Sequence, residues 1–246
     1  GGARADRRAV PPARRRRAAG RLRRRRRPPD RSEGMFRRPH HNAVLQALRR
    51  LDGALFERTE CWFAGGAAIV LRLGEYRESV DIGFLCASQR GYRDLREATG
   101  RSGLAGLARE GETLEALRDL RRDQYGIRTV LKVGETAIKF EIVREGRVDL
   151  AGRLDPDYGV PVLDRVDMYA EKLLANDDRW NDRAALGRDV IDLAMMISRW
   201  GPIPDAAWAK AEGAYGESVR TSFRRAAERM GNADRRARRL HELRMD

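Results

Sequence analysis

The chain has 246 residues, 36% of them charged, and a formal net charge of +14 at pH 7. This length allows a sizeable core in one or two compact domains. No run approaches the ~20 apolar residues of a membrane span, and no apolar segment follows the basic N-terminus as in a signal peptide. Two cysteines, Cys61 and Cys86, are too few for a disulfide framework. We therefore expect a cytoplasmic protein with buried free thiols and no membrane association.

Most of the excess positive charge lies at the N-terminus. Residues 1–34 hold 14 arginines against three acidic residues, so the remaining 212 residues carry only +3. With little to bury, this segment is expected to be a disordered tail. It is either an arm that contacts nucleic-acid phosphates or translated upstream sequence before a mis-assigned start. The second alternative is supported by Met35, which follows it directly, and by 47 arginines beside four lysines, as in a GC-rich genome.

The first elements mix helices and strands. Apolar residues recur at helical spacing over 42–58. A short apolar run over 61–64 ends at Gly65-Gly66, and an apolar segment over 67–73 follows. This order predicts a strand, a glycine turn and a helix. The next apolar run, 80–85, is rich in strand-forming residues and predicts a second strand.

A polar stretch and a hairpin come next. Residues 92–97 and 114–120 show only weak helical patterns. Two longer runs, 126–133 and 136–143, are joined by two residues and predict a β-hairpin.

The last part of the chain is helical in pattern. Successive helices are predicted over 164–175, 183–200, 204–213, 218–230 and 234–245. Strands followed by helices indicate an α+β fold, with an α/β domain over 35–160 and a helical domain over 161–246. The boundary is expected near Pro161.

The glycine pair and an acidic residue that follows it together indicate a site for phosphate and a metal ion. Gly65 and Gly66, at a strand-to-helix turn, leave backbone N–H groups at a helix N-terminus, which suits a phosphate. Asp81 then lies in an apolar strand, where a carboxylate needs a cation or a hydrogen-bond partner. A bound Mg²⁺ is one solution. Carboxylates at i and i+2 of one strand point to the same face and can hold metal ions that carry a triphosphate.

Further polar residues could complete such a site. Glu141 lies opposite the apolar face of its strand, beside Lys139, and is either a third carboxylate or part of a solvated face. On the predicted helices, Lys172 offers a compact charge suited to phosphate. Asp189 and Asp192, three residues apart, are either pocket residues or part of a surface charge lattice. Asp192 could alternatively hold Arg188 or a helix terminus.

These motifs together resemble the polymerase-β-like nucleotidyltransferase superfamily, and more closely the AbiEii/AbiGii toxin family. That family has Gly-Gly-(small)-Ala, then Arg-x-Ser-x-Asp-Ile-Asp, then Asp-x-x-x-Glu-Lys, then Arg-x4-Arg-Asp-x-x-Asp. The matching segments here are 65–68, 77–83, 167–172 and 183–192, in the same order.

The resemblance implies a polymerase-β-like nucleotidyltransferase domain with a mixed sheet, followed by a helical C-terminal domain. It implies an NTP substrate and transfer of NMP to a tRNA 3′ end or a protein hydroxyl, in a toxin paired with an antitoxin. The implied catalytic residues are Asp81, Glu141, Lys172 and Asp189. Mg²⁺ (or Mn²⁺) would be held by Asp81 and Glu141, and the nucleotide by Gly65, Gly66, Arg77, Ser79 and Lys172.

One position departs from the family pattern. Gly83 stands where a second aspartate is expected, two residues after Asp81. A metal site with one ligand fewer has less negative charge, and losing a transition-state interaction can cost several powers of ten in rate. Three explanations are open: an inactive relative that binds nucleotide, RNA or protein; a single-metal enzyme in which Glu141 or water fills the gap; or an isolated variant.

Overall fold

The structure is a computed structural model that describes residues 1–2 and 34–245. The chain divides into two units, Gly1–Glu33 and Gly34–Asp246, and the second contains all the helices and strands described below. The predicted arginine-rich tail falls almost entirely outside the described residues. The two alternatives for it, a nucleic-acid-binding arm and translated upstream sequence, therefore stay predictions. Within the described part, no helix is both long and apolar enough to cross a bilayer.

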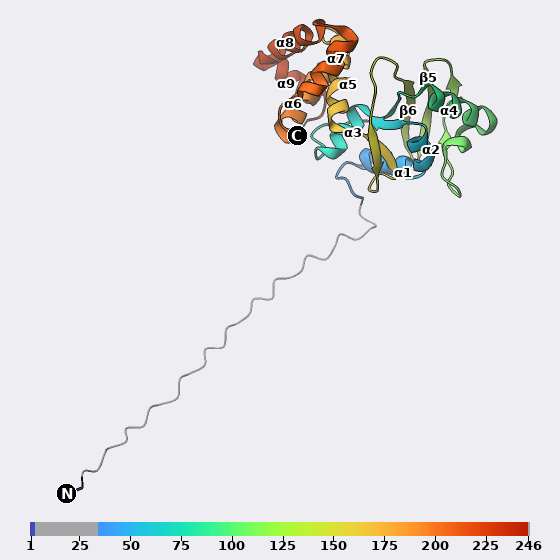
Figure 1. The fold of residues 1–246 in the computed structure, drawn as a ribbon, viewed down its shortest axis with the longest axis horizontal. Coiled ribbons are helices and arrows are strands. Elements are labelled where there is room, and N and C mark those ends of the chain that lie inside the picture. The colour runs from blue at the N-terminus through green and yellow to red at the C-terminus, as the bar shows by residue number, and fades with distance from the viewer. Residues whose placement is uncertain (3–33, 246) are drawn as a thin grey trace. The chain divides into compact units, whose positions relative to one another are not determined.

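An eight-stranded mixed sheet organises the first part of this unit (Figure 1). Its strands are β1 (Cys61–Ala64), β2 (Asp81–Cys86), β3 (Glu115–Ala116), β4 (Arg121–Arg122), β5 (Gly126–Val133), β6 (Thr136–Arg144), β7 (Gly152–Asp155) and β8 (Val160–Leu163). Their order is β3-β5-β6-β2-β1-β8-β7, and β4 pairs with β5. Strand β2 lies between β1, to which it is antiparallel, and β6, to which it is parallel. The strand that begins with Asp81 is therefore central.

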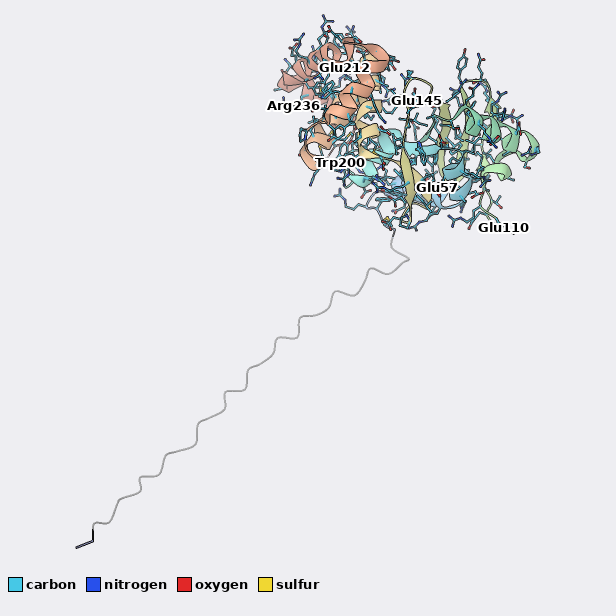
Figure 2. The ribbon with its side chains drawn as sticks, viewed as in Figure 1. Glu57, Glu110, Glu145, Trp200, Glu212 and Arg236 are labelled. Carbon is cyan, nitrogen blue, oxygen red and sulfur yellow. The ribbon has the colours of Figure 1, made fainter. Side chains whose placement is uncertain are left out.

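Helices surround the sheet and form a group beside it. They are α1 (Pro39–Arg49), α2 (Gly53–Arg58), α3 (Gly65–Arg72), α4 (Gln89–Ser102), the 3-10 helix η1 (Gly103–Leu107), α5 (Arg165–Arg179), α6 (Arg188–Trp200), α7 (Asp205–Tyr215), α8 (Ser218–Gly231) and α9 (Ala233–Glu242). Helix α5 packs against α6, α7 and α8, while α3 contacts both α5 and α6. Figure 2 marks the two ends of this unit, with Glu212 and Arg236 among the helices and Glu57 and Glu110 beside the sheet.

Alternation along β2 separates the core from the site. Ile82, Phe84 and Cys86 are fully buried, whereas Asp81 is exposed. The ring of Phe84 packs at centroid distances of 4.5 Å from Phe56 and 5.7 Å from Phe63. Because side chains along a strand alternate between faces, this packing turns the odd-numbered positions toward the opposite face. Cys61 and Cys86 are free and buried, as predicted.

Most predicted elements are confirmed. The strand, glycine turn and helix appear as β1 and α3, and the second strand appears as β2. The hairpin joins β5 to β6 across Gly134 and Glu135. The five predicted C-terminal helices appear as α5 to α9, with ends shifted by a few residues. The α+β class with a mixed sheet is therefore correct.

Three details differ. The single helix predicted over 42–58 is two helices, because the side chain of Asp52 accepts a hydrogen bond from the Leu55 N–H at 3.0 Å and caps a new helix. The weak helix predicted over 114–120 is wrong, since this stretch contributes the short strand β3. The hairpin of β7 and β8 was not predicted; its strands are only four residues each.

The second of these strands bears on the domain boundary. Strand β8 pairs with β1 through Val162, so the sheet extends beyond residue 160, and α5 begins at Arg165. The division into a nucleotidyltransferase domain and a helical domain stays a proposal, because residues 34–246 form one compact unit.

Candidate active site

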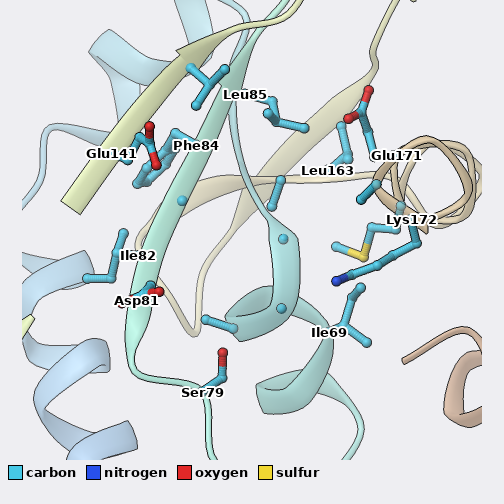
Figure 3. Close-up of a pocket in the computed structure, with 18 of the residues that line it drawn as sticks. Ile69, Ser79, Asp81, Ile82, Phe84, Leu85, Glu141, Leu163, Glu171 and Lys172 are labelled. Atoms are coloured by element: carbon cyan, nitrogen blue, oxygen red, sulfur yellow. The ribbon is translucent and has the colours of Figure 1, made fainter. Parts of the chain in front are cut away.

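A pocket of about 290 Å³ lies where the start of α3, strands β2 and β6, and helix α5 meet (Figure 3). It brings together residues from motifs that are far apart in the sequence. The predicted site residues that line it are Gly65, Gly66, Arg77, Ser79, Asp81, Glu141 and Lys172, together with the variant position Gly83. Asp189 does not line the pocket, but it contacts Lys172 directly.

Gly65 and Gly66 each require glycine, but for different physical reasons. Gly65 has a positive φ of 73°, which glycine adopts without strain. At Gly66, a Cβ atom would lie 2.5 Å from Nη2 of Arg77 and 3.3 Å from Oγ of Ser79. Ala64, the residue before α3, supplies no side-chain cap, so the first N–H groups of this helix have no partner from it. The helix therefore begins at the pocket with donors suited to an anion.

On the sheet side, two carboxylates line the pocket from neighbouring strands. Asp81 is exposed at the beginning of β2, and Glu141 is half-buried on β6. In the parallel pairing, Asp81 lies opposite Lys139 and Gly83 lies opposite Glu141, so the two carboxylates are diagonal neighbours. Glu141 Oε1 accepts a hydrogen bond from Nε of Arg128 at 2.5 Å, and its Oε2 lies 3.5 Å from Nζ of Lys139. Two cations therefore accompany Glu141.

Gly83 lies between these carboxylates with room around it. A Cβ atom at this position would meet only the carbonyl oxygen of Ala64, at 3.9 Å. Neither a close contact nor a positive φ requires glycine here. Packing therefore does not explain Gly83, and an aspartate would fit on the pocket face between Asp81 and Glu141.

The donor set limits which metal ion would fit. Among the residues that the structure describes, no three His, Cys, Asp or Glu side chains are grouped as a metal site. Asp81 and Glu141 alone suit an ion such as Mg²⁺, which keeps several waters and takes other ligands from substrate phosphates. They do not suit an ion that needs an all-protein cage. To bind such an ion, the Glu141 carboxylate would give up its contact with Arg128 or with Lys139.

The helix side of the pocket is built around Lys172, whose side chain is directed toward the start of α3 (Figure 3). Its Nζ lies 2.9 Å from Oδ1 of Asp189 and 2.7 Å from Oδ2 of Asp192. An ammonium group has three donors. Two of them face these carboxylates, which leaves one donor for a ligand in the pocket.

Asp192 also holds Arg77. Nε and Nη2 of Arg77 donate to the two carboxylate oxygens of Asp192 at 2.7 and 2.8 Å, and the hydroxyl of Tyr76 donates to Oδ1 at 2.6 Å. All three side chains are buried. The alternative that Asp192 holds Arg188 or a helix terminus is therefore wrong. Arg77 uses two of its five donors on Asp192 and a third, on Nη1, on the carbonyl oxygen of Glu78. Its predicted contact with a triphosphate would therefore use the face next to Gly66.

Asp189 completes this buried charge network. It accepts two hydrogen bonds from Arg179, at 2.6 and 2.9 Å, in addition to that from Lys172. Burial opposes ionisation, but the charges of Lys172 and Arg179 hold the pKa of Asp189 well below its usual range. The pKa of Asp192 is lowered in the same way, against burial, by Lys172 and Arg77. Both carboxylates stay ionised.

Glu171 is a pocket residue whose charge state differs. Its Oε1 is buried and has no hydrogen-bond partner among the described residues, and its Oε2 lies 3.7 Å from Nη2 of Arg147. Burial, with Glu145 as a further cause, raises the pKa of Glu171 to about 8. This carboxyl is therefore mostly protonated at neutral pH. It leaves α5 in a different direction from Lys172 (Figure 3).

A support for the loop before β2 was missed in the sequence. The ring of His41 is fully buried; its Nδ1 lies 2.8 Å from Oε1 of Glu75, and its Nε2 accepts the backbone N–H of Ser79 at 3.1 Å. An accepting Nε2 requires a neutral ring. Burial likewise lowers the pKa of His41. No motif marks His41, and only a buried position within the stripe of α1 could have indicated it.

The sequence matches the family model described as the nucleotidyl transferase AbiEii toxin of type IV toxin–antitoxin systems, over residues 46–245. This match spans the pocket and the buried charge network. The chain belongs to the AbiEii family. Comparison with curated proteins gives no significant match.

Solved structures with a similar arrangement are nucleotidyltransferase-like proteins. The chain is 15% identical to an antigenic nucleotidyltransferase-like protein from Paracoccidioides brasiliensis, with a TM-score of 0.45, covering 80% of this chain and 93% of that one. It is 14% identical to a nucleotidyltransferase-type protein from Helicobacter pylori, with a TM-score of 0.33, covering 76% of this chain and 95% of that one. The AbiEii assignment does not depend on these likenesses.

Proposed function

We propose that this AbiEii protein transfers NMP from an NTP to an acceptor hydroxyl, as the toxin of a toxin–antitoxin pair. One observation carries the proposal: residues from four separate motifs, the fourth represented by Arg188, line a single pocket with a helix N-terminus on one side and carboxylates on the other. The acceptor is a tRNA 3′ end or a protein hydroxyl.

In the proposed reaction the acceptor oxygen forms a bond to the α-phosphorus, the bond between the α-phosphorus and the bridging oxygen breaks, and pyrophosphate leaves. The N–H groups of Gly65 and Gly66, the remaining donor of Lys172, and Arg77 with Ser79 would bind phosphates. Asp81 and Glu141 would hold Mg²⁺ or Mn²⁺, which neutralises charge on the phosphates. Glu141 would alternatively take the proton of the acceptor hydroxyl. Asp189 positions Lys172.

The proposed role as a toxin brings partners with it. A cognate antitoxin would restrain the activity, and the NTP supply and RNA or protein acceptors place the proposed activity in the cytoplasm. We propose no membrane association.

Gly83 favours a second candidate function, a nucleotide-, RNA- or protein-binding homologue with impaired catalysis. The position has space for a carboxylate and lacks one. The phosphate side of the pocket does not depend on residue 83, so nucleotide binding would persist without turnover.

Label transfer distinguishes the two candidates. The full chain, Gly83→Asp and Asp81→Ala would each be incubated with labelled NTPs, Mg²⁺ and total tRNA or total cell protein. Incorporation by the natural chain that Asp81→Ala abolishes supports the enzyme. Incorporation only by Gly83→Asp supports the impaired homologue. If no variant incorporates label and none binds NTP, the transferase and the nucleotide-binding homologue are both wrong.

A further inference from the structure

A second cleft, of about 240 Å³, adjoins the nucleotide pocket on the other side of the Lys172–Asp189 ion pair. It lies among α5, the loop after α5, α6, α8 and α9. Arg179 lines both cavities, and Asp189 lines the second while binding Lys172 of the first. The two cavities are therefore neighbours on either side of these ion pairs.

The lining of this cleft is strongly basic. Its five arginines are Arg179, Arg183, Arg229, Arg235 and Arg239. Only two acidic residues, Asp182 and Asp189, line it, and the charge of Asp189 is already engaged by Lys172 and Arg179.

Two of these arginines, Arg183 and Arg235, form no side-chain ion pair or hydrogen bond with any residue that the structure describes. Arg229 donates to a neutral oxygen, Oδ1 of Asn181. Unpaired guanidinium groups around a cleft favour an anion, and phosphate oxygens match their planar fork of donors.

Two further groups suit a nucleic-acid ligand. Asn176 lines the cleft and is 1% exposed, and no described residue supplies an acceptor for its Nδ2. A buried amide donor without a partner costs free energy, which a phosphate oxygen would recover. Trp180 also lines the cleft, and the guanidinium of Arg229 lies 5.5 Å from its ring centroid.

The charge extends beyond the cleft along the last two helices. Residues 218–242 contain eight arginines and three acidic residues, a net +5, although residues 35–246 together carry only +3. The positive charge of the folded unit is thus concentrated on α8 and α9. A single free phosphate would use only part of this surface, whereas a strand with repeated phosphates would follow it.

We propose that this cleft binds backbone phosphates of a polynucleotide acceptor, whose end enters the nucleotide pocket past Arg179. The assignment rests on the proposed transferase function and specifies its acceptor as a nucleic-acid strand. Arg183 and Arg235 contact phosphates, and Asn176 donates to one of them. An acidic protein partner is the competing occupant.

The first test compares two double variants of the full chain for binding of a labelled single-stranded RNA. Arg183→Ala/Arg235→Ala removes cleft charges. Arg58→Ala/Arg109→Ala removes two arginines elsewhere that are exposed and have no carboxylate partner among the described residues. Both keep the same N-terminal segment. Each lost phosphate contact lowers the salt dependence of single-strand binding by about 0.7 in log–log slope, so the cleft variant should lose about 1.4. We expect about tenfold weaker binding at 150 mM salt for the cleft variant alone. Equal binding by the two variants would overturn the proposal.

Photocrosslinking locates the contact. RNA that carries 4-thiouridine should crosslink to the peptides around Trp180 and Arg235 in the control variant, and less in the cleft variant. Crosslinks confined to other peptides would overturn the proposal. Millimolar inorganic phosphate that displaces the RNA completely would assign the cleft to a lone phosphate. Polyglutamate that binds the cleft while RNA does not would assign it to an acidic protein.

Binding and transfer give separate readouts for the two proposals. RNA bound in the cleft without label transfer by either the natural chain or Gly83→Asp would reject the transferase and keep the cleft. Transfer to RNA with unchanged RNA affinity in the cleft variant would reject the cleft and keep the transferase. NTP binding by the cleft variant should equal that of the control, because neither substituted arginine lines the nucleotide pocket.

Discussion

The two sides of the proposed nucleotide pocket are built differently. On the helix side, Lys172, Asp189 and Asp192 are buried and joined to two arginines by hydrogen bonds between 2.6 and 2.9 Å. On the sheet side, Asp81 is exposed and its neighbour at i+2 has no side chain. The helix side is thus held by many mutual contacts, whereas the sheet side has few.

The helix side should matter mainly for the stability of the fold, and the sheet side mainly for the proposed chemistry. A buried charge network holds its own geometry, but it makes the fold dependent on every member, because each lost partner leaves an unpaired charge. An exposed carboxylate contributes little to folding and can be changed freely. Substitutions on the helix side should therefore act on folding, and those on the sheet side on chemistry alone.

The largest expected effect is on the helix side, at Asp192. Asp192→Ala takes from buried Arg77 the carboxylate it binds and from Lys172 one of its two carboxylates, so the free energy of unfolding should fall by about 3–5 kcal/mol. Urea denaturation monitored by circular dichroism measures it. The exposed Asp119→Ala should change stability by less than about 0.5 kcal/mol. A loss below about 1 kcal/mol in Asp192→Ala would mean that the network is not structurally important.

On the sheet side, a substitution should change the transfer rate and leave stability unchanged. Asp81→Ala should leave the urea midpoint unchanged and lower the label-transfer rate by about 10²–10³-fold, since a group that acts on developing charge is lost. If the variant unfolds instead, Asp81 is structural and the contrast between the two sides fails.

On the helix side, the titration of Glu171 should make the stability of the fold depend on pH. Its raised pKa, about 8, means that the folded state keeps a proton that the unfolded state releases near 4.5. Stability should therefore fall as pH rises from about 4.5 through 8. Glu171→Gln should remove this fall and be more stable by about 1–3 kcal/mol at pH 9, where the ionised carboxyl would be buried. The exposed Glu217→Gln serves as control, and an identical pH profile in all three proteins would contradict this.

His41 should give a smaller effect of opposite sign. Its lowered pKa means that the unfolded state binds a proton more readily, so stability falls as pH drops below 6.5 toward the folded pKa. His41→Gln should be about 1 kcal/mol less stable at pH 7.5 and should lose this acid sensitivity. The matched variant His241→Gln should retain it. Urea midpoints measured between pH 5 and 7.5 test this assignment of the acid sensitivity to His41. If His41→Gln is as acid-sensitive as the natural chain, the assignment is wrong.

The sequence predicted what local patterns determine. Period-two alternation placed Glu141 opposite the apolar face of its strand, and a glycine pair between apolar runs marked the turn into α3. The break near Asp52 was missed even though Asp52-Gly53 is a turn and capping pair, because the apolar stripe continues across it. Local periodicity cannot show where a helix restarts.

Pairings across long separations could not be predicted. Arg77 and Asp192 are 115 residues apart, and the motifs gave both a role without showing that they bind each other. The link from His41 to the N–H of Ser79 depends on how α1 lies against the loop before β2. The open space at Gly83 likewise required the positions of neighbouring backbone atoms.

In the proposed site, the phosphate side is complete and the metal side lacks one carboxylate, at Gly83. The most direct measurement is the Mg²⁺ concentration needed for half-maximal NTP binding, by titration calorimetry on the natural chain and on Gly83→Asp. Both should fold equally and bind NTP, and Gly83→Asp should need about tenfold less Mg²⁺, since it restores a carboxylate ligand beside Asp81. The same Mg²⁺ requirement in both proteins, or no NTP binding by either, would contradict the claim.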